Sequence, residues 1–528
     1  MKNFLLAASV LMAGSGLAAE ADTTSDPLMN LFIQKGYVTQ QEAAKVKAEA
    51  ERLRTNKLAA AALPVSRWKI DPGVKNMELF GDVRLRYEGR KATDPAGGSI
   101  ELNRLRYAVR FGLRGEAFDD FYYGLRLETS ANPRSTWVSM GTSSSSSNPY
   151  QGAPFGKSSG TFGVGQAYLG WKHDDWLDIT LGKMPNPLYT TSMVWDGDLN
   201  PEGAAERFKY TVGEASFFAN FGQFLYQDTN PTKTSDGYFN PNTVNSSSLP
   251  FLLALQGGVN YRLTKKVDFK IAPVLYLYTR FNNGQNPNAS GSGYNPDFSG
   301  TYVGQGSTFG VNGTPAYYNL DNPGFNGFYA NQTGINKLLV LEVPFEVNMQ
   351  LEKFKLRFFG DYAQNLQGSD RAKEAYNAAN SYYFSASGPG GGTIDPITSP
   401  QTKDIHAYQI GFGIGSTNLD YGQMKGAVYG NSTRRHAWEF RTYWQHIEQY
   451  SLDPNLIDSD LFEGRENMQG IYVAFAYCFS ENVYGVARYG YASRINDKLG
   501  TGGSNQDIPQ MNPIDSYNLF QVDLGVRF

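Results

Sequence analysis

Apolar and polar residues alternate along most of the chain from Met77 to Phe528. In the first such run, Leu79, Val83 and Leu85 occupy odd positions, and charged residues fill most of the even positions between them. Because successive side chains of a strand point to opposite faces, this period of two predicts β-strands with one apolar and one polar face. The terminal LFQVDLGVRF repeats the pattern and ends on an aromatic residue.

The alternating segments predict an all-β fold with about 16 strands, and about 18 is the alternative count. A soluble β-sandwich also alternates, but it turns its apolar face toward a core. Here the polar faces of successive strands are dense with arginine, which favours a polar lumen and an apolar face toward lipid. We therefore predict a transmembrane antiparallel β-barrel over residues 77–528.

The connections between these strands alternate between short and long, as is typical of outer-membrane barrels. The predicted short turns lie near Glu116, Lys172, Val212, Thr264, Leu351 and Ser480. The predicted external loops are rich in Gly, Ser, Asn and Pro and cover Ser130–Thr161, Gln227–Pro250, Phe281–Asn336, Gln367–Asp404 and Ser493–Asn518. Segment Ser416–Arg435 falls where a short turn is expected, so it holds either a hidden strand pair or an insertion.

The N-terminus has the pattern of a secretory signal peptide. Lys2 precedes an apolar stretch, and Ala19-Glu20-Ala21 matches a cleavage site for residues 1–21. The remaining boundaries are 22–64 for a short periplasmic α-helical segment, 65–76 for a linker and 77–528 for the barrel.

The predicted helical segment contains a capping box at Thr39–Glu42 and ends at Pro64. Val46, Ala50 and Leu53 recur at helical spacing and form a short apolar stripe. This stripe predicts either a coiled coil that joins subunits or a monomeric spacer.

Composition agrees with a barrel and narrows the alternatives. The chain has 528 residues with 34 Tyr and 33 Phe, and barrels need such residues for two aromatic girdles at the membrane interfaces. The single cysteine excludes an intramolecular disulfide framework. The formal net charge of −3 gives no indication of nucleic-acid binding.

Several segments, in order along the chain, resemble the putative porin family of Gram-negative outer membranes. They are LFIQKGYVTQQEAAKVKAE, ELFGDVRLRYE, NRLRYAVRFGLRGE, QAYLGWK, ITLGKMPNP, FGDYAQN, TYWQHIEQYSLDPNLIDSDLFEGRENMQGIYV and the terminal QVDLGVRF. The terminal Phe528 is also how outer-membrane barrels end. The resemblance implies a general diffusion channel, trimeric or monomeric, without catalytic residues, and it leaves the solute undefined.

The candidate site combines a basic wall with an acidic loop. The pore-lining basic residues are Arg84, Arg86, Arg104, Arg106, Arg110, Arg114 and Arg126, from the first three strands. The connection between the fifth and sixth strands, the third external loop, carries the acidic residues Asp196, Asp198, Glu202 and Glu206. By analogy with trimeric porins, this loop would fold into the lumen, so that acid facing a basic wall sets a transverse field. Ordinary pairing of the arginines with Asp82, Glu88 and Glu128 between neighbouring strands is the alternative, and both can hold together.

Other chemistry has little support. The four histidines, His173, His406, His436 and His446, lack metal-ligand spacing. An acidic external loop with Asp453, Asp458, Asp460, Glu463 and Glu466 offers hard oxygen ligands but not the regular spacing of a calcium loop. We predict no catalytic site, no metal and no cofactor, and an inert thiol at Cys478.

The sequence thus predicts an outer-membrane porin that allows passive diffusion of small hydrophilic solutes and ions. The alternative within transport is an anion- or phosphate-selective channel, suggested by the arginines. An outer-membrane adhesin or barrel enzyme is the alternative of another class. The expected partners are outer-membrane lipid, small hydrophilic solutes and, as an open alternative to a monomer, a homotrimer, with no nucleic acid.

Overall fold

The computed structural model divides the chain into two compact units, Met1–Pro72 and Gly73–Phe528. The predicted signal peptide and nearly all of the predicted helical segment lie outside the residues that the structure describes. The described residues are 73–95, 97–118, 120–130, 135–141, 161–226, 232–233, 239–240, 250–280, 337–373, 399–416, 434–502, 507–508, 511 and 513–528, with single residues at 35, 39 and 45.

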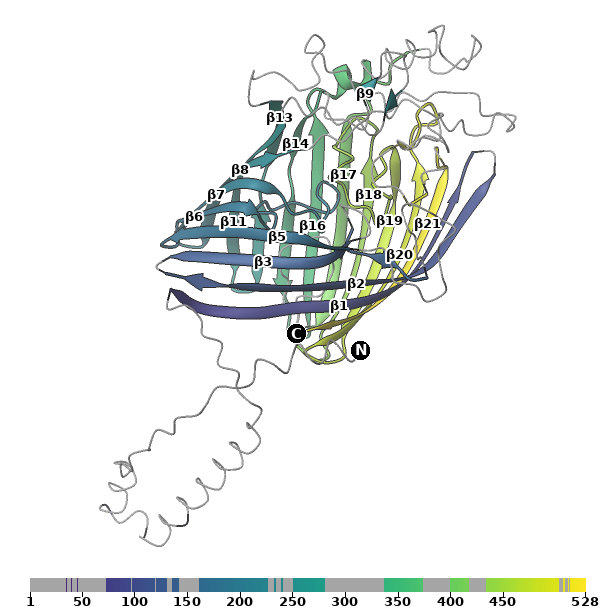
Figure 1. Cartoon of the computed structure of the whole chain (residues 1–528). Helices are drawn as coiled ribbons and strands as arrows, with labels where there is room; N and C mark the ends of the chain where they lie inside the picture. The colour runs from purple at the N-terminus through teal and green to yellow at the C-terminus, as the bar shows by residue number, and fades with distance from the viewer. Residues whose placement is uncertain are drawn as a thin grey trace. The chain divides into compact units, whose positions relative to one another are not determined.

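The second unit is a closed antiparallel β-barrel with 16 strands around its wall (Figure 1). The first strand, β1 (Val74–Thr93), pairs with β2 (Ser99–Ala117) on one side and with the last strand, β21 (Ser516–Arg527), on the other. At this seam the backbone N–H of Gly81 donates to the carbonyl oxygen of Phe528 at 2.9 Å, and the N–H of Phe528 donates back at 3.0 Å. The sheet therefore has no free edge at its two ends.

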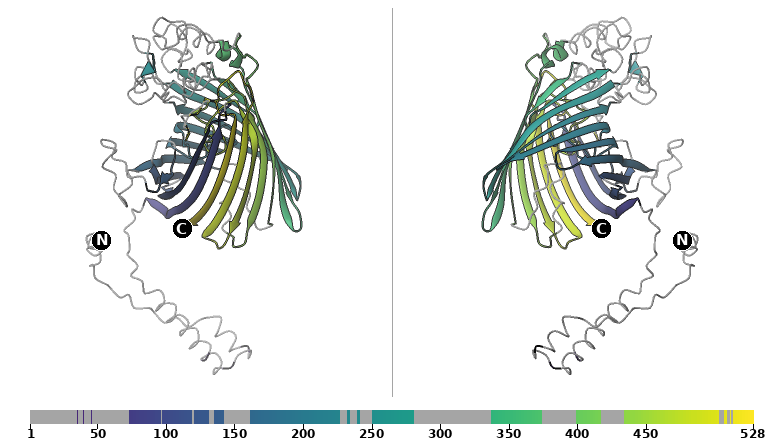
Figure 2. Two further views of the ribbon diagram at one scale, coloured as in Figure 1. Left: turned by 90° about the vertical axis from the view of Figure 1, so that its right-hand side faces the viewer. Right: turned by 90° about the vertical axis from the view of Figure 1, so that its left-hand side faces the viewer.

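The other strands follow in chain order around the wall, tilted as Figure 2 shows. They are β3 (Phe121–Ser130), β5 (Thr161–His173), β6 (Leu177–Lys183), β7 (Glu202–Val212), β8 (Ala215–Leu225), β11 (Pro250–Thr264), β12 (Val267–Ile271) with β13 (Val274–Arg280), β14 (Leu339–Glu342) with β15 (Phe345–Gln350), β16 (Phe354–Asn365), β17 (His406–Ser416), β18 (Trp438–Ile447), β19 (Met468–Cys478) and β20 (Val483–Arg494). Short β4 (Val138–Ser139) pairs with β2, and β9 (Thr232–Lys233) with β10 (Phe239–Asn240) forms a separate hairpin.

Two of the strands are interrupted at prolines. The break between β12 and β13 contains Pro273, and the break between β14 and β15 contains Pro344. Proline has no N–H to donate to a neighbouring strand, so regular pairing stops there. The carbonyl oxygens remain in use: Pro273 accepts from Gly257 at 3.1 Å and Pro344 accepts from Ala272 at 3.1 Å.

The predicted alternation is confirmed as two faces of the wall. Leu79 is 63% exposed and Leu105 is 55% exposed, whereas Arg86 is 3% exposed and Glu88 is 0% exposed. Apolar side chains thus cover the outside, as contact with lipid requires, and charged side chains line the inside. Outward aromatic side chains gather at the end with the short turns, which we call the turn end: Phe118, Trp176, Phe354 and Phe479.

The segment that broke the turn pattern connects neighbouring strands. β17 pairs directly with β18, with Ala407 opposite Ile447 and Gly415 opposite Glu439. β17 and β18 are therefore neighbours in the barrel wall, and no strand pair separates them there. Residues 417–433 themselves lie outside the described part of the chain.

Among the residues that the structure describes, no helix has the length and apolar character needed to cross a membrane.

Part of the barrel interior is filled by the connection between β6 and β7, residues 184–201, which we call inner loop 1. Its residues Met193 and Trp195 are 0% and 5% exposed. The Trp195 ring lies 6.1 Å from the ring of Phe224 in β8 and 6.5 Å from that of Tyr276 in β13. Inner loop 1 thus packs apolar side chains against the inner wall beside these strands, and the open part of the lumen lies elsewhere.

Candidate functional site

A basic wall runs along the inward positions of β1, β2 and β3, and we call it the arginine face. Strand register places Asp82 opposite Arg110 and Arg86 opposite Arg106. In a strand every second side chain points inward, so residues two apart in sequence lie together on the arginine face. Six of the predicted arginines line one cavity: Arg84, Arg86, Arg106, Arg110, Arg114 and Arg126. The seventh, Arg104, donates to Glu88 at 2.7 Å and lies 2.6 Å from Asp507.

The arginine face is partly neutralised by acids on the same and neighbouring strands. Asp82 serves two arginines, with its carboxylate oxygens 2.9 Å from Nε of Arg84 and 2.7 Å from Nε of Arg110. Arg86 binds Asp523 of β21 through two nitrogens, at 2.7 and 3.0 Å. The pairing between neighbouring strands that the sequence offered as an alternative is therefore present, together with the approach of an acidic loop.

Inner loop 1 is fastened to the wall opposite the arginine face. The N–H of Tyr189 donates to Gln256 of β11 at 2.9 Å. The hydroxyl of Thr190 donates to Glu342 of β14 at 2.6 Å, and the hydroxyl of Thr191 donates to Asp361 of β16. These contacts hold the acidic part of the loop, Asp196 and Asp198, inside the barrel, where both residues line the cavity.

The other two predicted loop acids are placed elsewhere, which corrects the prediction. Glu202 and Glu206 belong to β7, and the cavity is not lined by either. Glu202 pairs with Lys183 at 2.5 Å, and Glu206 accepts from Gln223 at 2.8 Å. Glu206 shares the outward face of β7 with the exposed Phe208 and Tyr210, because the period of two separates it from the inward positions. Neither carboxylate faces the lumen beside the arginine face.

A second loop, missed from the sequence as part of the site, enters the barrel beside the first. Residues 448–467, which we call inner loop 2, were expected as an external acidic loop, yet Asp458 and Asp460 line the cavity. The N–H of Asp196 donates to the carbonyl oxygen of Leu456 at 2.5 Å, and the N–H of Asp458 donates to that of Ser192 at 3.1 Å. These bonds join the two inner loops. We call the row of aspartates where they meet, Asp196, Asp198, Asp458 and Asp460, the acidic seam.

The two sides of the acidic seam share a local motif that could have revealed it. Asp196-Gly197-Asp198 and Asp458-Ser459-Asp460 are both D-x-D turns. In each, the first carboxylate accepts the N–H of the second aspartate, at 2.9 Å for Asp198 and 2.6 Å for Asp460. This Asx-type bond turns the backbone so that both aspartates reach the cavity.

The charges at the acidic seam, which lies outside the strands, are not all equal. Burial and the neighbouring Asp458 raise the pKa of Asp196 well above its ordinary value. Burial and Asp460 raise the pKa of Asp458 to about 7. Burial would raise the pKa of Asp460 as well, but the charges of Arg86 and Arg488 outweigh it and lower that pKa. Near neutral pH the seam therefore holds protonated carboxyls beside ionised ones.

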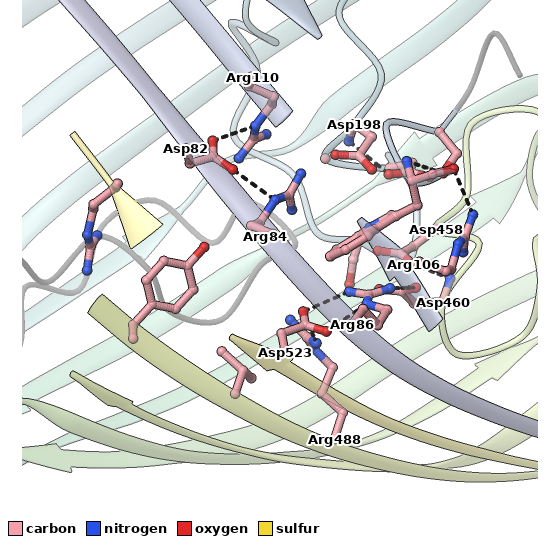
Figure 3. A pocket seen from close by; sticks show the side chains of 18 of the residues that line it. Asp82, Arg84, Arg86, Arg106, Arg110, Asp198, Asp458, Asp460, Arg488 and Asp523 are labelled. Atoms are coloured by element: carbon pink, nitrogen blue, oxygen red, sulfur yellow. Dashed lines mark hydrogen bonds and ion pairs between the residues drawn. The ribbon is translucent and has the colours of Figure 1, made fainter. Parts of the chain in front are cut away.

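The cavity between the arginine face and the acidic seam has a volume of about 910 Å³. Figure 3 shows Asp198 across this space from Arg84 and Arg110. The indole of Trp137 lines the cavity, with the guanidinium carbons of Arg84 and Arg86 at 4.7 and 4.1 Å from the ring centroid. Among the described residues that line it, nine are arginines and nine are aspartates or glutamates.

Inner loop 2 carries further buried charges that hold it in place. Arg465 is 1% exposed and donates to the backbone carbonyls of Thr501, Met511 and Ile508 at 3.1, 2.9 and 2.6 Å. Asp453 accepts the hydroxyls of Tyr226 and Tyr278 at 2.8 and 2.7 Å. These acids and bases tie the loop to neighbouring segments rather than facing the cavity.

The remaining candidates are structural. Within the described ranges, no group of three or more His, Cys, Asp or Glu side chains is arranged to hold a metal ion. His446 stacks on Tyr408 with ring centroids 4.6 Å apart. Cys478 is buried, and its sulfur lies 3.9 Å from Nη2 of Arg527.

Comparison with known proteins gives one family. The model of the putative porin family matches residues 91–528. Among curated proteins, no relative matches the chain.

Solved structures with a similar arrangement are distant. They include OprB of Pseudomonas putida (9% identity, 86% of this chain and 94% of that chain, TM-score 0.40) and OmpF of Salmonella typhi (10% identity, 87% and 99%, TM-score 0.39). The outer membrane channel DcaP of Acinetobacter baumannii is similar at 10% identity, 87% and 99% coverage and a TM-score of 0.37. Similarity at this level supports no statement about function, so the family match carries the assignment.

Proposed function

This chain belongs to the putative porin family and is an outer-membrane channel, and we propose that solutes and ions cross it through the cavity between the arginine face and the acidic seam. The observation that carries the proposal is the approach of Asp198, on a loop fastened inside a closed barrel, to Arg84 and Arg110 on the wall. Opposite charges across a narrow aqueous space create a transverse field. Such a field sorts ions and orients dipolar solutes.

The two inner loops fill part of the barrel interior, which supports a restricted path for solutes. Inner loop 1 packs against β8 and β13, and inner loop 2 joins it along the acidic seam. A solute is therefore directed toward the side of the lumen that carries the arginine face. Small hydrophilic solutes and ions pass by diffusion, and the family and the fold favour a channel over an enzyme.

An anion- or phosphate-selective channel is the second candidate, and one observation favours it. Arg84 and Arg110 share a single carboxylate, that of Asp82. A guanidinium is always ionised and presents several fixed N–H donors, so the shared acid leaves positive charge available to a passing anion. The adhesin alternative rests only on the long loops, most of which lie outside the described residues.

Placement in the cell follows from the same proposal. The apolar outer wall faces lipid of a Gram-negative outer membrane, the long loops face outward, and the N-terminal segment faces the periplasm. A homotrimer is the alternative to a monomer, and a coiled coil of the N-terminal helices would support it.

Reversal potentials in planar bilayers test the proposal. Replacing Arg84 and Arg110 together with glutamine should shift the selectivity toward cations, and Asp198→Asn should shift it toward anions. The matched control is Glu206→Gln, an acid-to-amide change on the outward face, which should leave the selectivity unchanged. The shifts should shrink near 1 M salt, where the screening length falls to about 3 Å. Unchanged reversal potentials in both cavity variants would place the path elsewhere, and a wild-type channel with strong anion preference would favour the second candidate.

A further inference from the structure

In the cavity, the carboxylate of Asp198 and the guanidinium groups of Arg84 and Arg110 face each other without forming an ion pair. Asp198 has no ion-pair partner within 4.0 Å among the residues that the structure describes. Arg84 and Arg110 act on it through space. Figure 3 shows the gap between them. A ligand that spans the gap would satisfy both sides at once.

On the arginine side of this gap, the guanidinium groups have more N–H donors than the neighbouring acceptors use. Arg84 and Arg110 both use Nε for Asp82. Of the terminal nitrogens, Nη2 of Arg84 donates to the hydroxyl of Thr136 at 3.1 Å. Two guanidiniums that share one carboxylate keep one net positive charge, and a forked guanidinium matches the two oxygens of a carboxylate.

The cavity also carries aromatic side chains among its charged ones. Trp137 and Tyr484 line the cavity near the arginines, and Tyr443 and Tyr472 line it near inner loop 2. Such surfaces favour a short carbon chain between two polar ends, since ligand sites combine apolar walls with a few placed polar groups. The volume of about 910 Å³ admits a solute of this size together with water.

We infer that this gap is a binding site for small dipolar ions, with a carboxylate at Arg84 and Arg110 and a protonated amine at Asp198. The inference rests on the proposed function, because it treats the cavity as the path of permeation. A simple anion satisfies only the arginines and a simple cation only Asp198. The dipolar solute gains both contacts and aligns with the transverse field, so it enters more readily than either.

Uptake by proteoliposomes of three solutes of nearly equal length tests the inference: γ-aminobutyrate, pentanoate and pentylammonium. In wild-type protein, γ-aminobutyrate should saturate and permeate at least about fivefold faster than either singly charged solute, since it gains a second charge contact. Asp198→Asn should reduce its rate to that of pentanoate. The control Glu206→Gln should keep the wild-type order of the three rates.

The outcomes separate this inference from the proposed function. A wild-type protein that conducts ions but passes γ-aminobutyrate no faster than pentanoate and pentylammonium overturns the binding site and leaves the channel standing. Retention of the preference in Asp198→Asn also overturns it. A folded, heat-modifiable wild-type barrel without any ion conductance would instead overturn the proposed function itself.

Discussion

The ion selectivity of the channel should depend on pH because of one carboxyl group at the acidic seam. Burial and Asp460 raise the pKa of Asp458 to about 7, so this side chain changes charge in the physiological range. Below that pH the carboxyl is neutral, the acidic side of the cavity is weaker, and the arginines favour anions. Above it the carboxylate is ionised and offsets one more guanidinium. Anion preference should therefore fall as the pH rises through about 7.

The size of the effect follows from the charges that line the cavity. Nine arginines and nine acids line the cavity, so ionisation of Asp458 adds one negative charge and offsets one positive charge there. In water, a unit charge about 7 Å from a passing ion changes that ion's energy by about 0.6 kcal/mol. Screening near 0.1 M salt roughly halves this value. The change has opposite signs for cations and anions, so their permeability ratio should shift about threefold.

The assay is the reversal potential in a KCl gradient, measured in steps from about pH 6 to about pH 8. Over this interval a group with a pKa near 7 goes from about 10% to about 90% ionised. Asp458→Asn keeps an oxygen that accepts the N–H of Asp460 but removes the titration. This variant should show the acid-side selectivity of the wild type at every pH, while Glu206→Gln should titrate as the wild type does. A wild-type reversal potential that is flat through pH 7, or a pH step that persists in Asp458→Asn, would refute the reasoning.

Three other features can be tested. Replacing Thr190 and Thr191 together with valine removes the hydroxyls that bond Glu342 and Asp361, at a cost of roughly 1–3 kcal/mol for each buried acceptor left unpaired. The result should be larger and noisier single-channel currents, and currents identical to wild type would mean that these bonds do not hold inner loop 1. An epitope inserted in residues 281–336 should be labelled on intact cells and one at Thr264–Lys266 should not; the reverse pattern would invert the barrel. Deletion of Pro27–Leu63 should lower the oligomer fraction on native gels while the barrel stays heat-modifiable, and an unchanged oligomer fraction would reduce the segment to a spacer.

The barrel could be predicted from the sequence because its wall depends on local patterns. Each strand shows its two faces within a few residues, so the strand count and the arginines were found from periodicity alone. Glu202 and Glu206 were assigned to the loop, but β7 begins at Glu202 and Glu206 is its fifth residue. At such a boundary, sequence reasoning is least secure, and the facing of a side chain changes with every residue.

Inner loop 2 could not be placed in the same way. Its contacts with inner loop 1 join residues that are far apart in the chain, such as Asp196 and Leu456, and no periodicity encodes where a long loop folds. An acidic loop can lie in solvent outside the barrel as readily as in its lumen, so its composition does not reveal its position. Only the repeated D-x-D turns could have linked the two loops, and each turn alone is common.

The pairing of β1 with β21 determines the order in which the protein can become a channel. The ion pair between Arg86 and Asp523 joins residues 437 apart, whereas a neighbouring hairpin closes over some tens of residues. Closing the long loop costs roughly 2–3 kcal/mol more in chain entropy than closing such a hairpin. Asp523 and Arg488, which also line the cavity, are added only with the last two strands. A barrel still in assembly therefore lacks part of the charge pattern of the finished cavity.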